Sequence, residues 1–172
     1  MKKLLLVGWD AADWQVIEPL MKEGKMPALQ RLVKNGISGN IATLNPPLSP
    51  MLWTSIATSK RAYDHGVNGF VEVDYNKGEI KPVQATSRKV GTFWNILNEA
   101  GLKTNIVNWW PSHPAEKVDG VCVSNAFHQK APSKGEPWPF ENCGYTLRSL
   151  PWRTLNLLYP KPPGLTQRTI KC

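Results

Sequence analysis

The chain has 172 residues, enough for one domain with a sizeable core but not for two comfortable ones. Hydrophobic residues make up 41% and charged residues 20%, which excludes a collagen-like chain and a membrane bundle. The formal net charge of +8 suggests an anionic partner, but residues 142–172 contribute +5 of it and contain no acidic residue. Because no other basic cluster is dense, we expect no specific nucleic-acid site.

The first third of the chain predicts strands that alternate with helices. Residues 4–9 are a continuous apolar run that ends at Asp10, the pattern of a buried strand in a parallel sheet. Helical periodicity follows from Trp14 and ends at Gly24, and a second helix fits 27–34, with Gly36 after it. Residues 37–44 alternate enough to predict a second strand.

The pattern continues after a proline-rich loop at 45–50. We predict helices over 50–58 and 93–100, short strands over 69–73, 105–110 and 118–123, and a hairpin turn at 76–78. Alternating strands and helices imply right-handed crossovers. The predicted fold class is therefore α/β, with a mostly parallel sheet and helices on both faces.

Residues 129–172 differ in composition from the rest of the chain. From Pro132 onward the chain holds seven of its fifteen prolines, and the apolar residues there follow no period. We therefore predict a division into an α/β part, 1–128, and an irregular basic tail, 129–172. The three cysteines form no metal-binding pair and the N-terminus lacks the features of a signal peptide, so we expect reduced thiols and a cytoplasmic protein without a membrane span.

Two residues at the ends of predicted elements could carry chemistry. Asp10 lies at the carboxyl end of the first predicted strand, where it suits either a divalent-metal ligand or a helix cap, although Asp13 is the better cap. Ser49 precedes Pro50 at the start of a helix, which is a cap signature. A hydroxyl at a helix N-terminus also suits phosphate binding and, beside a metal, nucleophilic attack.

Two loop residues remain ambiguous from the residues alone. His65 follows a polar segment, and for a lone histidine a hydrogen-bonded turn residue is the simpler interpretation. Asn68 fits either a solvated loop or a ligand contact. His113 and His128 favour the same simple interpretation as His65.

Several segments in order resemble the type I phosphodiesterase/nucleotide pyrophosphatase family of the alkaline phosphatase superfamily. They are LLLVGWDAADW (4–14), MPALQRLVKNG (26–36), PPLSPMLWTSIAT (46–58), HGV (65–67), NWWPSHPAE (108–116) and VDGV (118–121). The resemblance covers roughly residues 3–128, and the order of the segments is more specific than any one of them.

This resemblance implies an alkaline phosphatase-like fold and a role for each matching position. Asp10 matches the first metal-ligand aspartate, and Ser49 matches the nucleophile that also bridges the metals. The implied reaction is hydrolysis of a small-molecule phosphoester with two divalent metals, usually zinc, and a transiently modified Ser49. His65 matches a family loop position near the substrate, and we take His65 and Asn68 as candidate substrate contacts. Ser59 replaces the glycine that is usual there, which puts the local loop geometry in question.

The remaining ligands of the family have no counterpart in this sequence. Residues 129–172 contain no histidine and no aspartate, so we expect an incomplete metal site and a truncated or frameshifted product with foreign sequence from about residue 141. Three functions stay open at this point. They are a phosphoester hydrolase, an inactive remnant, and a basic-tailed module that binds anions. The oligomeric state is open as well.

Overall fold

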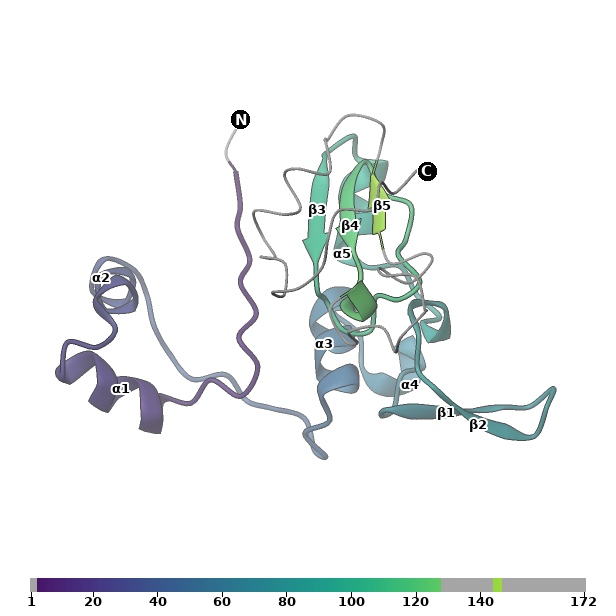
Figure 1. Cartoon of the computed structure of the whole chain (residues 1–172), viewed down its shortest axis with the longest axis horizontal. Coiled ribbons are helices and arrows are strands. Elements are labelled where there is room, and N and C mark those ends of the chain that lie inside the picture. The colour runs from purple at the N-terminus through teal and green to yellow at the C-terminus, as the bar shows by residue number, and fades with distance from the viewer. Residues whose placement is uncertain (1–2, 128–143, 147–172) are drawn as a thin grey trace, which may run out of the picture. The chain divides into compact units, whose positions relative to one another are not determined.

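The computed structural model describes residues 3–127 and the backbone of 144–146, in two compact units divided after Ser49 (Figure 1). The helices are α1 (Trp14–Lys22), α2 (Pro27–Asn35), α3 (Ser49–Thr58), α4 (Ala62–His65) and α5 (Phe93–Glu99), with 3-10 turns at Ala85–Ser87 and Asn125–Phe127. The strands are β1 (Val71–Asp74), β2 (Glu79–Pro82), β3 (Thr104–Val107), β4 (Gly120–Val123) and β5 (Gly144–Thr146).

The first unit forms the two helices that its local signals predict. Asp13 caps α1 by accepting a hydrogen bond from the backbone N–H of Gln15 at 2.8 Å, and Gly24 follows the helix with a left-handed φ of 72°. Pro27 occupies the first turn of α2, where its missing N–H costs nothing. Ile17 is the one buried side chain among residues 3–49.

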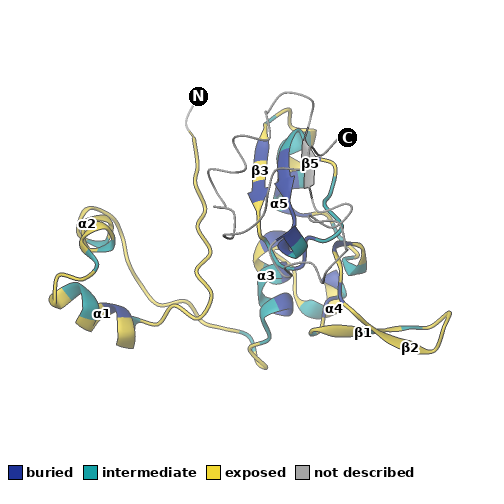
Figure 2. Cartoon of the chain, viewed as in Figure 1, coloured by how far each residue is buried: buried dark blue, intermediate teal, exposed yellow. Residues whose placement is uncertain are grey.

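The two strands predicted in this unit are absent. Residues 4–9 and 37–44 run without strand pairing, and their apolar side chains, such as Leu4, Val7 and Ile41, are exposed (Figure 2). A strand gains stability from hydrogen bonds to a neighbour and from burial of its faces. Within 3–127 and 144–146, nothing pairs with either segment, so apolar composition alone leaves them extended and unpaired.

The second unit contains a three-stranded sheet in the order β3–β4–β5. β3 and β4 are parallel, with Thr104 opposite Gly120, and β5 pairs with β4 in the antiparallel sense. The connection from β3 to β4 is irregular instead of helical. β5 lies in the segment predicted to be an irregular tail, so residues 144–146 depart from that prediction by forming a strand.

An antiparallel hairpin, β1–β2, confirms the turn predicted around 76–78. Glu72 pairs with Lys81 in the register, and Val73 pairs with Ile80. Lys81 lies 3.5 Å from carboxylate oxygens of both Glu72 and Asp74, which places the charged residues on one face of the hairpin. The hairpin extends away from the β3–β4–β5 sheet (Figure 1).

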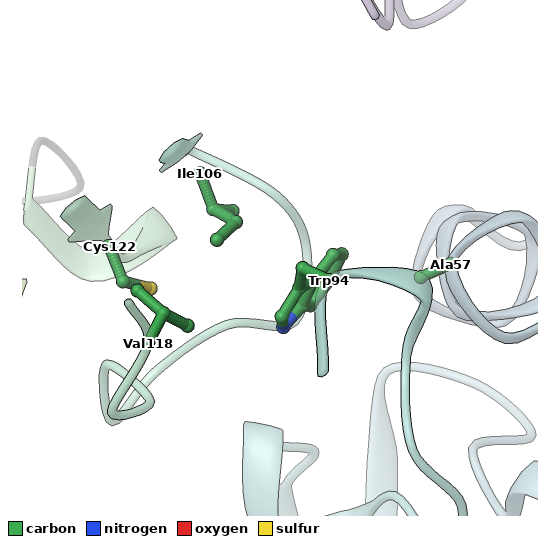
Figure 3. Close-up of a cluster of buried hydrophobic side chains, with 5 residues drawn as sticks. All are labelled: Ala57, Trp94, Ile106, Val118 and Cys122. Atoms are coloured by element: carbon green, nitrogen blue, oxygen red, sulfur yellow. The ribbon is translucent and has the colours of Figure 1, made fainter. Parts of the chain in front are cut away.

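The core of the second unit is built around Trp94. Thr92 caps α5 through a reciprocal capping box with Asn95, and the helix then places Trp94 inside with no exposed surface. Trp94 lies between Ala57 of α3 on one side and a group of strand and loop residues on the other (Figure 3). That group consists of Ile106, Val118 and Cys122.

The described residues combine helices with small sheets that include a parallel pair, which is compatible with the α/β class. One of the three described strand pairs is parallel, so the mostly parallel sheet of the prediction is not what these residues form. The predicted helices over 50–58 and 93–100 are confirmed. Apart from 144–146, the predicted tail at 129–172 lies outside the described residues.

Candidate functional site

Ser49 is the first residue of α3, and its side chain is half-buried. The position follows from the local sequence, because Pro50 suits the first turn of a helix and lacks an N–H. The N–H groups of the first turn have no acceptor within the helix, and the helix dipole makes this end positive. Ser49 therefore lies where a phosphate oxygen or an alkoxide is stabilised.

The helix that begins at Ser49 is rich in hydroxyl groups that bond to its own backbone. Thr54 donates to the carbonyl of Pro50 at 2.7 Å, Ser55 donates to that of Met51 at 2.9 Å, and Thr58 donates to that of Thr54 at 2.8 Å. These bonds let polar side chains face a packed environment without unpaired groups. The mixed apolar and hydroxyl sequence of α3 is therefore compatible with burial.

His65 ends α4 and is completely buried. Its Nδ1 accepts a hydrogen bond from the backbone N–H of Val67 at 3.1 Å, and its Nε2 lies 2.9 Å from Oγ of Ser55. Burial lowers the pKa of His65, with Asp64 opposing and Arg88 adding to that effect. Both ring nitrogens have protein partners, which favours a structural role; contact with a substrate stays a prediction.

Asp10 is exposed and lies in a turn before α1. Asp13 provides the cap of α1, as its position before the apolar period predicted, so capping does not account for Asp10. No hydrogen bond or ion pair joins Asp10 to Ser49 among the described residues. The structure thus leaves Asp10 open to solvent, and its role as a metal ligand stays a prediction.

The loops after α3 show two further features of the predicted site. Asn68 is exposed, and its predicted substrate contact stays a prediction. Ser59 has a φ of 54°, the left-handed conformation that glycine adopts without strain. The sequence-based concern about a serine at this position therefore has a definite geometric basis.

A cluster of aromatic side chains packs against α3, and the sequence analysis did not predict it. Trp109 donates its ring N–H to the carbonyl of Trp53 at 3.1 Å, and the two rings meet edge to face at 5.4 Å between centroids. Trp109 also meets Phe93 and Trp94 edge to face. The sequence predicted Trp109 as the end of a strand, but β3 ends at Val107 and Asn108 takes a left-handed φ of 56°.

A buried ion pair was also missed, because its partners are 28 residues apart. Arg88 donates to Oε1 of Glu116 at 2.5 Å, and Trp94 donates its ring N–H to the other carboxylate oxygen at 3.1 Å. The side chain of Arg88 is 6% exposed. No local pattern signals such a pair, since only the fold brings the two loops together.

Residues 4–154 of the chain match the family described as type I phosphodiesterase / nucleotide pyrophosphatase. The chain belongs to this family. Neither the curated proteins nor the solved structures gave a significant match.

The family match extends further than the sequence motifs. It continues past residue 128, the end of the resemblance found from the sequence segments, and past residue 141, where foreign sequence was expected. The strand β5 at 144–146 lies inside the matched range. The phosphodiesterase resemblance therefore covers most of the chain and includes part of the predicted tail.

The metals expected of a phosphodiesterase of this family need more ligands than the described residues bring together. No group of three or more His, Cys, Asp or Glu side chains suited to a metal ion occurs within 3–127. Asp10 and Ser49 supply two candidate ligands, which is too few for a two-metal centre. The described donor set alone does not fit two zinc ions.

The helices of this phosphodiesterase-family chain are short compared with a membrane-spanning helix. None of the described helices is both long and apolar enough to cross one. The longest, α3, has 10 residues, whereas a span needs about 20.

Proposed function

We propose that this protein is a phosphoester hydrolase, acting on phosphodiester or pyrophosphate bonds of small molecules, with Ser49 as its nucleophile. The observation that supports it most is the position of Ser49. In a chain of this family, the serine that matches the nucleophile is the first residue of an α-helix. There the free N–H groups and the positive end of the dipole favour a bound phosphoryl group.

The chemistry that this chain contributes centres on the hydroxyl of Ser49. Its oxygen attacks phosphorus, the leaving oxygen departs, and Ser49 becomes transiently esterified before water releases the product. Backbone N–H groups of the first turn of α3 stabilise the charge on the phosphoryl oxygens. Asp10 is the second proposed site residue, as a ligand for a divalent metal, with further ligands needed beyond the described residues.

The nucleophile is tested with bis(nitrophenyl) phosphate and added zinc. We expect Ser49→Ala to lower nitrophenol release at least about 100-fold, because the attacking atom is removed. Ser38→Ala is the matched control, since Ser38 is an exposed loop hydroxyl in the same unit and should leave the rate unchanged. Equal release by the wild type and Ser49→Ala would reject catalysis through this serine and favour an inactive homologue.

A second candidate function rests on charge distribution. Residues 142–172 carry five Lys/Arg and no acidic residue, so this segment could bind anionic surfaces. A chain ending at residue 141 should then lose salt-sensitive binding to heparin. Unchanged binding by the shortened chain would reject this function.

A further inference from the structure

A continuous chain of hydrogen bonds links the turn after α4 to the second turn of α3. The backbone N–H of Val67 can only donate, so Nδ1 of His65 is the acceptor. The single N–H of the neutral ring is then on Nε2, which donates to Oγ of Ser55. Ser55 in turn donates to the carbonyl of Met51. All three hydrogen bonds therefore point the same way along the path, from Val67 through His65 and Ser55 to Met51.

The surroundings hold this path in place. His65 has no exposed surface, and its carbonyl accepts from the backbone N–H of Lys89 at 3.0 Å. The aliphatic part of Lys89 covers Gly66 so closely that an added Cβ would lie 3.0 Å from it. The ring therefore cannot rotate toward solvent without displacing its neighbours.

Besides the bond from His65 to Ser55, a second side-chain hydrogen bond from outside the helix anchors α3. Trp109 binds the carbonyl of Trp53, two residues before Ser55. Both anchors thus act on the middle of the helix, while residues 45–47, before its N-terminus, are exposed. These two hydrogen bonds, made four and six residues beyond Ser49, therefore add directional contacts to a helix whose start is also held by the burial of Pro50 and Met51.

We propose that His65 is a positioning residue for Ser49, acting through Ser55 to hold α3 at a fixed angle. This inference rests on the proposed function of Ser49. Ser55 lies about 9 Å along the helix from Ser49, so a tilt of about 10° there would move Ser49 by roughly 1.5 Å. A misplacement of that size is enough to reduce the rate of attack about 100-fold.

The two nitrogens of His65 can be replaced separately. His65→Asn keeps an acceptor at the position of Nδ1 but is too short to reach Ser55. His65→Gln extends an amide nitrogen toward the position of Nε2 and can donate to Ser55. His113→Gln is the control, because it also removes a partly buried imidazole, one that lies 3.4 Å from Ser124 instead of beside α3.

Amide hydrogen exchange on the full chain tests the anchoring without any need for activity. For residues 51–56, we expect exchange about tenfold faster in His65→Asn and in Ser55→Ala, and close to the wild-type rate in His65→Gln and His113→Gln. Unchanged exchange in both His65→Asn and Ser55→Ala would overturn the proposal. Equal acceleration in His65→Asn and His65→Gln would also overturn it, since the bond to Ser55 would then be irrelevant.

Steady-state kinetics with bis(nitrophenyl) phosphate connects the anchoring to Ser49. We expect His65→Asn to lower kcat about 100-fold with KM little changed, and His65→Gln to restore most of kcat. A loss of kcat that His65→Gln does not restore would overturn the positioning role. Equal activity of the wild type and Ser49→Ala would overturn the proposed function instead, and the exchange rates would still decide whether His65 holds α3.

Discussion

The two units of the chain contain equally good helix signals but differ in what they bury. Residues 3–49 form two helices, α1 with a cap from Asp13 and α2 with Pro27 in its first turn, yet Ile17 is their one buried side chain. In the second unit, α3 with 10 residues and α5 with 7 residues both contribute to the core around Trp94. Local signals are therefore sufficient to place helices, whereas stability comes from partners that cover their apolar faces.

The largest effect is expected from removing the central tryptophan of the second unit. Trp94→Ala should lower the free energy of unfolding by about 3–5 kcal/mol, because it leaves a cavity and an unpaired carboxylate oxygen on Glu116. Trp9→Ala in the first unit should change it by less than about 0.5 kcal/mol, since Trp9 is 57% exposed. Urea unfolding followed by circular dichroism measures both. Similar losses would show that the units are equally packed.

The ion pairs of the two units should differ in the same direction. Glu116→Gln leaves the buried Arg88 without a counter-charge and should cost about 2 kcal/mol. Glu23→Gln removes an ion pair with Lys25 in which both side chains are more than half exposed, and should cost less than about 0.5 kcal/mol. Thermal unfolding of both variants measures the contrast. A larger loss in Glu23→Gln would contradict it.

Stability should depend on pH through two histidines of the second unit, the buried His65 and the partly buried His113. Burial lowers the pKa of His65 and of His113 in the folded state, so the unfolded chain binds protons more readily as pH falls below about 6.5. The contribution of these two histidines to the free energy of unfolding is fully present above about pH 6.5. It is lost as the pH falls from there toward their lowered pKa values in the folded state. Urea unfolding between pH 7.5 and 5.5 measures this decline.

The matched variant for the pH dependence is His65→Gln. It should decline less steeply than the wild type over this range, because one of the two titrating groups is gone. The same slope in both proteins would show that His65 does not contribute.

The smallest effect concerns how a helix ends in each unit. α1 is followed by Gly24 at a φ of 72°, whereas α3 is followed by Ser59 at 54°. Ser59→Gly should raise the free energy of unfolding by about 1 kcal/mol, and Gly24→Ala should lower local helix stability by a similar amount. Thermal unfolding of Ser59→Gly checks the first value. A lower melting temperature would mean that the serine side chain makes a compensating contact.

The sequence predicted α1, α2, α3 and α5 because their signals are local, whereas the four-residue α4 was not predicted. Asp13 before Trp14, Pro27 at the start of α2, and Gly101 after α5 each act within one turn of the helix that they begin or end. The strands are a different case. The apolar run at 4–9 reads as a buried strand, yet none of the residues that the structure describes pairs with it, while β3 and β4 pair with each other.

The candidate site likewise combines features set by neighbouring residues with contacts set only by the fold. The sequence alone indicated the family, a helix over 50–58 with Ser49 at its start, and the unusual residue at Ser59, because each depends on neighbours along the chain. Tertiary structure alone decided that His65 binds Ser55 and that Arg88 binds Glu116. Pairs like these join residues 10 and 28 positions apart, and no local preference encodes which distant side chain folding will place within hydrogen-bonding distance.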